Sequence, residues 1–207
     1  MKKLPLTSTA TILAAVLASL LATGCAPLLI GGAMVGGVSV ATDRRTSGTQ
    51  LEDQTIEVKA GARLREQLGD KVHINVNSYN RVALITGEAR NEADRAEVER
   101  IVGGVENVSR VMNEVAVTMH SSLSTRSNDV VIKSKVKAQL IDARDLHSNA
   151  FYVVVERGEV FLLGRVTERE ANRATEIARQ VGGVKKVVRA FEIISEDELA
   201  RTLPKKS

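Results

Sequence analysis

The chain of 207 residues has very few aromatic residues and a single cysteine. Its aromatics are three Phe and two Tyr, with no Trp. This scarcity argues against the aromatic stacking platforms on which single-stranded nucleic acid binds. One cysteine excludes an intramolecular disulfide and a zinc site built from several cysteines. The apolar fraction of 43% is sufficient for a packed core, so the length predicts one or two folded domains.

The cysteine follows a segment that is typical of exported bacterial proteins. Lys2 and Lys3 precede an apolar stretch at 10–22, which is too short for a stable transmembrane helix. The small residues at 22–24 before Cys25 resemble the lipobox of bacterial lipoproteins. This resemblance implies cleavage after residue 24, with a diacylglycerol and an N-acyl group on Cys25 and no other cofactor. The alternative is an ordinary signal peptide with an incidental cysteine.

The residues after Cys25 indicate the membrane to which the protein is directed and how its folded domains are joined to Cys25. Ala26 stands in place of the Asp that resembles an inner-membrane retention signal, which implies the outer membrane of a Gram-negative cell. Residues 26–50 are glycine-rich, and we expect 25–50 to be a lipidated flexible tether. A short strand or helix docked on the body is the alternative.

Two stretches, 53–119 and 129–195, repeat the same order of patterns. Each begins with apolar residues at every fourth position, which predicts a helix. Two short apolar runs around a polar turn predict a hairpin, and a second helix and a last strand follow. We therefore expect two α+β domains of α-β-β-α-β order, each with a three-stranded mixed sheet against two helices. The expected parts are a signal peptide at 1–24, a tether at 25–50, domains at 51–119 and 129–195, a linker at 120–128 and a flexible tail at 196–207.

The second helix of each copy carries capping signals. Thr167 and Glu170 fit a capping box, and Asn91 is the expected cap in the first copy. The sequence VGGV follows both helices, and its glycines are expected to end them in the left-handed conformation. The residues expected to face the core from the earlier helix are Ala93, Ala96 and Val102.

These motifs resemble the BON domain family. GEVFLLG at 158–164 and the two VGGV tetrapeptides carry the resemblance, and with the lipobox the whole chain resembles dual-BON outer-membrane lipoproteins. One departure is Arg81, which takes the place of the hairpin glycine in the first copy. The resemblance implies a periplasmic, non-enzymatic module that binds phospholipid, supports envelope integrity and associates with division sites.

No catalytic constellation is visible in the sequence. His73, His120 and His147 are scattered and lack the spacing of metal ligands. The serines between 121 and 127 have no motif that supplies a base and an orienting acid. The residues therefore predict that the protein is not an enzyme.

The two copies differ in charge. Residues 51–118 contain nine Lys and Arg against twelve Asp and Glu, whereas residues 126–194 contain thirteen against nine. In the first helix of the second copy, aliphatic residues opposite the core face lie between basic flanks, a pattern typical of helices at a membrane interface. The residues expected to contact phospholipid are Val130, Val131, Lys133, Ser134, Lys135, Lys137, Ala138 and Ile141.

The sequence thus predicts an outer-membrane lipoprotein that binds anionic phospholipids such as phosphatidylglycerol and cardiolipin through its second domain. Two alternatives stay open. Val131 and Ile141 could pack against the first copy, or the apolar face and the sheet edges could dock an envelope protein, which would make the chain an interaction scaffold. Nucleic acid is excluded as a partner by the export signal and the scarcity of aromatics.

Overall fold

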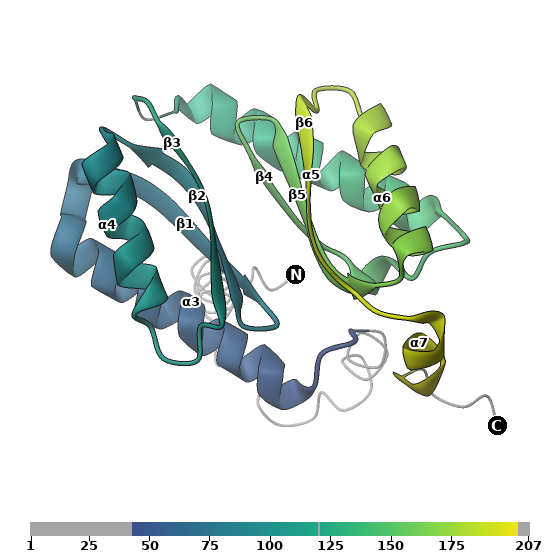
Figure 1. Cartoon of the computed structure of the whole chain (residues 1–207). Helices are drawn as coiled ribbons and strands as arrows, with labels where there is room; N and C mark the ends of the chain where they lie inside the picture. The colour runs from purple at the N-terminus through teal and green to yellow at the C-terminus, as the bar shows by residue number, and fades with distance from the viewer. Residues whose placement is uncertain (1–42, 120, 203–207) are drawn as a thin grey trace, which may run out of the picture. The chain divides into compact units, whose positions relative to one another are not determined.

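The computed structural model describes residues 43–119 and 121–202, so the expected signal peptide, Cys25 and most of the expected tether lie outside the described residues (Figure 1). The first repeat comprises α3 (Ser47–Leu68), β1 (Val72–Tyr79), β2 (Val82–Ala89), α4 (Glu92–Gly103) and β3 (Arg110–Val117). The second comprises α5 (Leu123–Asp142), β4 (Tyr152–Glu156), β5 (Glu159–Val166), α6 (Glu168–Gln180) and β6 (Lys186–Ile193). Short 3-10 turns at Gly69–Lys71 and Ser148–Ala150 precede β1 and β4, and α7 (Glu196–Thr202) follows β6.

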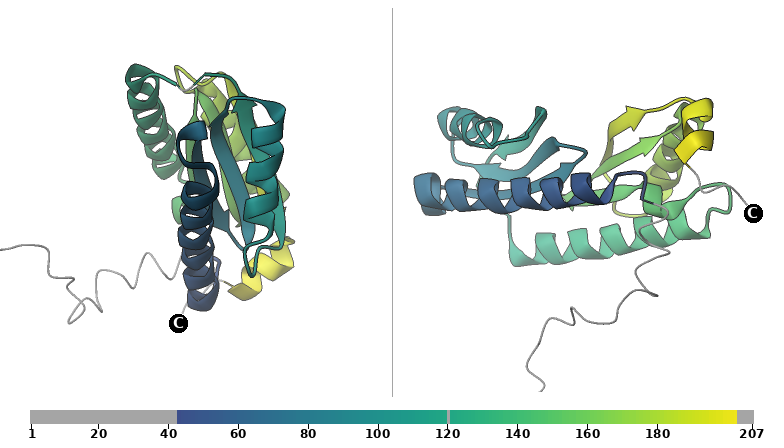
Figure 2. Two further views of the ribbon diagram at one scale, coloured as in Figure 1. Left: turned by 90° about the vertical axis from the view of Figure 1, so that its left-hand side faces the viewer. Right: turned by 90° about the horizontal axis from the view of Figure 1, so that it is seen from below.

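The α-β-β-α-β order and the mixed sheets predicted from the sequence are confirmed. In the first sheet β1 pairs antiparallel with β2, and β2 pairs parallel with β3. The second sheet repeats this arrangement with β4, β5 and β6. The parallel pairing requires a crossover, and α4 and α6 supply it. In each repeat both helices lie on the same face of the sheet (Figures 1 and 2).

Each repeat has its own apolar core between the helices and the sheet. In the first, the buried residues of α3 recur every four positions, and Ala83 and Ile85 of β2 face them. In the second, α5 and α6 pack on Val160 and Leu162 of β5. Side chains alternate between the faces of a strand, so the residues between these positions point to the opposite face of each sheet.

A third apolar cluster joins those opposite faces. Leu84 of β2 and Phe161 of β5 lie in this cluster and are 0% and 1% exposed. Its other buried members are Tyr79, Val154, Leu163 and Ala190. The uninterrupted apolar run of β5 follows from this arrangement, because the strand is buried on both faces. The two repeats therefore pack on each other, sheet against sheet.

A buried aspartate from the first helix of each repeat holds the hairpin turn. The turn residues 80–81 and 157–158 all have positive φ. Asp53 accepts hydrogen bonds of 2.8 Å from both backbone amides of the first turn. Asp129 accepts bonds of 2.8 and 2.7 Å from both amides of the second. These bonds offset the strain of Arg81, a non-glycine residue at φ 66°.

Three segments expected to be irregular are ordered in the structure. α3 begins at Ser47, inside the expected tether, and α5 begins at Leu123, inside the expected linker. The Thr46 and Ser122 side chains cap these helices by accepting hydrogen bonds from the third amide of each. The expected tail contains α7, where Leu199 is buried. At the starts of α3 and α5, the polar capping residues Thr46 and Ser122 have the composition of an irregular segment, so the helix starts were placed too late.

Two details of the second helices also differ from expectation. The Asn91 cap and the capping box of Thr167 and Glu170 are confirmed. Val102 is buried as predicted, but Ala93 and Ala96 are exposed, and Val98 and Ile101 face the core in their place. Among the glycines of the two VGGV sequences, Gly183 alone has positive φ, so left-handed glycine does not end α4.

Candidate functional site

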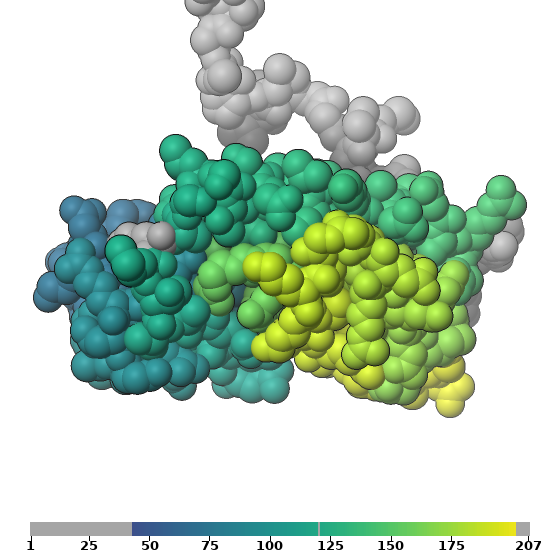
Figure 3. All heavy atoms as spheres, turned by 90° about the horizontal axis from the view of Figure 1, so that it is seen from above, coloured from purple at the N-terminus to yellow at the C-terminus, as the bar shows by residue number. Residues whose placement is uncertain are grey.

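Helix α5 runs along the surface of the described body (Figures 2 and 3). It has a buried face and an exposed aliphatic face on opposite sides. Ile132, Val136 and Leu140 are buried in the core, as predicted. On the exposed face the fractional exposures are 64% for Val130, 49% for Val131 and 67% for Ile141. Ser134 and Ala138 of the same face are also exposed. The first repeat therefore does not cover this face, and the alternative in which Val131 and Ile141 pack against it is wrong.

Basic residues flank the aliphatic face. Lys135 and Lys137 are exposed and Lys133 is half-buried. Burial lowers the pKa of the Lys133 ammonium, and the nearby positive charge of Lys137 adds to the effect. In the described part of the chain, no carboxylate lies within ion-pair distance of these three ammonium groups, so their charge is available to an external anion.

The structure extends this face toward the start of the helix. Leu123, which the sequence analysis placed in a linker, is 80% exposed and lies seven residues, or two turns, before Val130. Arg126 lies two turns before Lys133 and continues the basic flank. The signal that could have found them is the cap at Ser122, which lengthens the helix by six residues relative to a start at Asp129.

The matching helix α3 differs in charge. It exposes Leu51 and Val58, at 65% and 71%. Two of its three basic residues are paired, however, because Lys59 and Arg63 contact Glu106 at 3.2 and 3.0 Å. Helix α3 thus has exposed aliphatics and mostly paired basic residues, whereas α5 has exposed aliphatics beside three lysines that form no ion pair within the described residues.

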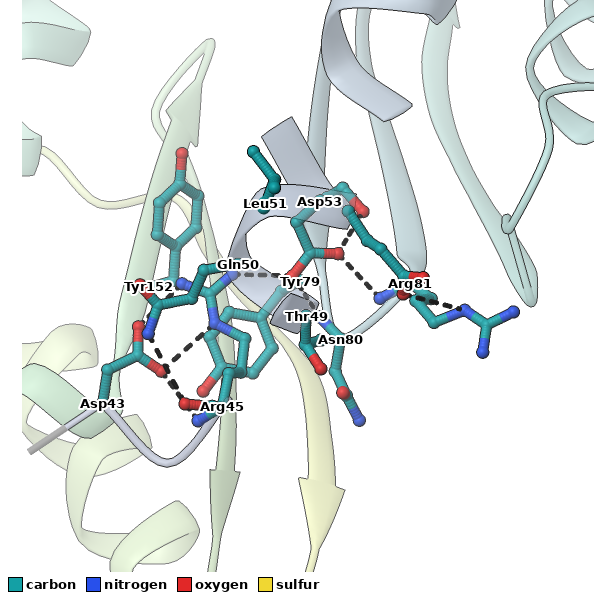
Figure 4. A network of polar contacts seen from close by, with 12 residues as sticks. Asp43, Arg45, Thr49, Gln50, Leu51, Asp53, Tyr79, Asn80, Arg81 and Tyr152 are labelled. Atoms are coloured by element: carbon teal, nitrogen blue, oxygen red, sulfur yellow. Dashed lines mark hydrogen bonds and ion pairs between the residues drawn. The ribbon is translucent and has the colours of Figure 1, made fainter. Parts of the chain in front are cut away.

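A polar network joins the residues just before α3 to both repeats (Figure 4). Arg45 binds Asp43 and Asp53, with 2.8 Å from its guanidinium nitrogens to each carboxylate, and its guanidinium lies 4.2 Å from the ring centroid of Tyr79. Tyr79 in turn packs near Tyr152 of the second repeat, with ring centroids 6.5 Å apart. Burial raises the pKa of Tyr79 to about 12, so its hydroxyl is neutral at physiological pH.

The described residues contain no cluster of side chains suited to metal binding. No group of three or more His, Cys, Asp or Glu side chains among them could hold a metal ion. His73 contacts Glu88 at 3.1 Å, and Ser122 caps α5. Within residues 43–119 and 121–202, none of the helices combines the length and the apolar character that crossing a bilayer requires.

Comparison with known proteins finds a matching family and several similar proteins. The BON domain family matches residues 52–119 and 128–195. The chain is 36% identical over 173 residues to the outer membrane lipoprotein DolP of Haemophilus influenzae, covering 83% of this chain and 89% of that one. It is 30% identical to the 21 kDa hemolysin of Actinobacillus pleuropneumoniae, covering 73% and 79% of the two chains.

A further relative is the osmotically-inducible protein Y of Escherichia coli, which is 28% identical over 184 residues, with 86% and 92% of the two chains covered. None of these three names denotes an enzyme. The two family matches coincide with the two α-β-β-α-β repeats. The chain belongs to the BON domain family and contains two BON domains.

Proposed function

We propose that this protein is a lipoprotein of the outer membrane, facing the periplasm, that binds anionic phospholipid through α5 of its second BON domain. The observation that carries the proposal is the open face of α5, where exposed aliphatic residues lie beside unpaired ammonium groups. Such a helix can place its aliphatics among headgroups while its lysines meet phosphates. Similarity to an outer membrane lipoprotein supports the location.

The expected strength of attachment follows from the parts of the face. Each Lys or Arg near an anionic surface contributes about 1 kcal/mol, reduced by salt. Aromatic side chains, which anchor many interfacial helices, are absent from α5. The helix therefore binds weakly and supplies lipid choice and orientation, whereas the acyl chains on Cys25, at about 0.8 kcal/mol per CH₂, supply retention.

Flotation with vesicles tests the lipid contact. The mature chain is prepared without acyl groups as the Cys25→Ser variant and mixed with vesicles of phosphatidylglycerol, cardiolipin or phosphatidylcholine. We expect flotation with the two anionic lipids, and its loss when Lys133→Glu and Lys137→Glu are combined. Lys59→Glu with Arg63→Glu changes the net charge equally on α3 and is the matched control, and Glu57→Lys on the same helix should have little effect.

Unchanged flotation of the Lys133→Glu, Lys137→Glu variant would remove α5 as the lipid site. If the unacylated wild type binds none of the vesicles, the lipid proposal fails. The open face of α5 would then be a docking surface for an envelope protein, and the chain would be an interaction scaffold.

Labelling with a fatty-acid probe tests the anchor. We expect label on the wild type and none on Cys25→Ser, because the thioether requires the sulfur atom of Cys25. Equal labelling of both proteins would contradict lipidation at this residue.

We further propose that lipid binding supports envelope integrity, including at division sites. In cells that produce only the Lys133→Glu, Lys137→Glu variant, we expect greater sensitivity to antibiotics that an intact outer membrane excludes, and loss of a fluorescent fusion from division septa. Cells with the matched α3 variant should behave as wild type. If the α5 variant and the α3 variant showed the same antibiotic sensitivity and the same localisation, lipid binding through α5 would be needed neither for envelope integrity nor for placement at division sites.

A further inference from the structure

Arg44 docks the residues that lead to the N-terminal region onto the second BON domain. Its side chain is only 4% exposed, and its guanidinium donates to both carboxylate oxygens of Glu170 at 2.7 and 2.8 Å. It also donates to the backbone carbonyl of Arg165 at 2.8 Å. Glu170 is 1% exposed and is the capping-box residue of α6, 126 positions away in sequence. This is a bidentate pair between a residue preceding the first domain and a helix of the second.

Arg45, the next residue, binds the first domain. Its guanidinium donates to Asp53 of α3 and lies over the ring of Tyr79 at the end of β1 (Figure 4). Two consecutive arginines therefore bind different domains. We call residues 43–45 the exit segment, because the chain that carries Cys25 joins the described body here.

The exit segment begins beside the lipid-contacting end of α5. Asp43 lines a hollow of about 260 Å³ together with Lys137 and Ile141 of the open face. Phe151 and Val153 of the second domain line the same hollow. The chain from the anchor thus enters the body next to the residues proposed to meet the bilayer.

We propose that Arg44 is a positioning residue, which fixes the exit segment on the second BON domain so that the acylated N-terminus and the open face of α5 meet the same membrane leaflet. The inference rests on the proposed lipid contact and adds how that contact is oriented. Seventeen residues separate Cys25 from Asp43, and covalent geometry allows them to span at most about 60 Å. That reach is about twice the length of α5, which is about 30 Å for twenty residues.

Because of this reach, the anchor alone does not decide which face of the protein meets the membrane. Attachment beside Lys137 and Ile141 does decide it, because it holds these residues near the point where the chain leaves for the bilayer. The fixed attachment raises the effective concentration of α5 at the surface without any new lipid contact. It also reduces the orientational freedom lost on binding.

The test places a dye at position 138 of the acylated full-length protein in phosphatidylglycerol vesicles. Acylation blocks Cys25, so Ala138→Cys supplies the one free thiol for an environment-sensitive fluorophore. The clamp variant combines Arg44→Met with Glu170→Gln, because glutamine keeps the capping box and leaves no unpaired buried charge. Arg65→Met with Glu66→Gln, a neighbouring exposed pair on α3, is the matched control.

In the wild type and in the matched control we expect membrane-like emission from the dye. In the clamp variant we expect the inserted fraction to fall about two- to threefold, because the loss of fixed attachment lowers the effective concentration of α5 at the bilayer. The unacylated Cys25→Ser forms of the wild type and the clamp variant should bind vesicles equally, because the open face itself is unaltered.

Three results would contradict parts of this scheme, and they are distinguishable. Equal insertion in the wild type and the clamp variant would overturn the role of Arg44 and leave the lipid contact standing. Weaker vesicle binding by the unacylated clamp variant would also overturn it, because Arg44 would then act through the fold of the second domain. Aqueous emission from the acylated wild type, with no flotation of its unacylated form, would overturn the proposed lipid contact itself.

Discussion

Asp53 and Asp129 occupy matching positions in the two repeats, and each carboxylate accepts hydrogen bonds from two successive amides of the hairpin turn in its own domain. Asp53 additionally accepts from the Ser78 hydroxyl at 2.7 Å and pairs with Arg45. Both residues are buried. A helix and a hairpin that are about 28 residues apart in sequence are thereby joined in each domain.

Replacing either aspartate with alanine leaves two amides of its hairpin turn without their acceptor. We expect Asp129→Ala to lower the free energy of unfolding by about 2–3 kcal/mol, and Asp53→Ala to lower it more, because Ser78 and Arg45 also lose a partner. Urea unfolding followed by circular dichroism measures both effects. Asp142→Ala, an exposed aspartate at the end of α5, is the control and should change stability by less than about 0.5 kcal/mol. If Asp129→Ala were as stable as the wild type, Asp129 would not be needed to hold the hairpin turn.

Gly87 and Gly164 lie inside strands β2 and β5 where a side chain has no room. A Cβ atom would lie 2.0 Å from the His73 carbonyl oxygen at the first position and 2.3 Å from that of Ala150 at the second. We expect Gly87→Ala and Gly164→Ala each to destabilise the fold by about 3 kcal/mol or more, through steric overlap and positive φ. Thermal unfolding measures the loss.

Gly182→Ala is the matched control for these glycines, because no atom lies within 4 Å of its added Cβ. Its effect should stay within about 0.5 kcal/mol. If all three variants melted at similar temperatures, the close approach of the backbone at Gly87 and Gly164 would be refuted.

Glu156 and Glu170 are both buried carboxylates, and we expect opposite pH dependence from them. Burial raises the pKa of Glu156 above its usual range, although a hydrogen bond from Asn75 acts against this. The folded state then binds the proton more tightly than the unfolded state. Stability from this group is present at low pH and is lost as pH rises above about 4.3, the usual value for an unfolded Glu.

For Glu170, burial also favours the neutral acid, but the bonds from Arg44 and the Thr167 amide hold its pKa below the usual range. Its contribution is therefore present above the unfolded pKa and is lost as pH falls through the lower folded value. We expect Glu156→Gln to stabilise the protein at pH 7, with the gain shrinking toward pH 4, and Glu170→Gln to destabilise it at pH 7. Urea midpoints at both pH values measure this, and equal signs for the two variants would contradict the assignment.

Lys137 and Ile141 are adjacent on the open face of α5, but we expect their contributions to lipid binding to differ in salt dependence. Lys137→Gln should weaken partitioning onto phosphatidylglycerol vesicles about fivefold at low salt, equivalent to about 1 kcal/mol, and less at high salt. Ile141→Ser should weaken it about tenfold at every salt concentration, because aliphatic burial is not screened.

Val58→Ser provides the control for Ile141→Ser, because Val58 is similarly exposed but lies on α3. The exposed fractions are 71% for Val58 and 67% for Ile141. Its partitioning should match the wild type. A loss as large as that of Ile141→Ser would show that both BON domains contact lipid.

The regular elements were predictable because their signals are local. Hydrophobic periodicity located ten helices and strands of the two repeats, and the spacing of Ile132, Val136 and Leu140 identified the buried stripe of α5 correctly. The exposed positions opposite that stripe followed from helix geometry. The start of α5 was missed, because Ser122 and its polar neighbours have the composition of a linker as well as that of a helix cap.

Local patterns along the chain were enough to predict the duplication, the α-β-β-α-β order, the capping box at Thr167 and the separation of apolar from basic residues on α5. Three contacts could be seen only in the folded protein: Leu84 and Phe161 pack the two sheets together, Asp53 and Asp129 hold the hairpin turns, and Arg44 binds Glu170. The physical reason is that helices and caps form between residues a few positions apart and leave a periodic pattern. A contact across 126 positions depends on how surfaces fit after folding and leaves no pattern along the chain.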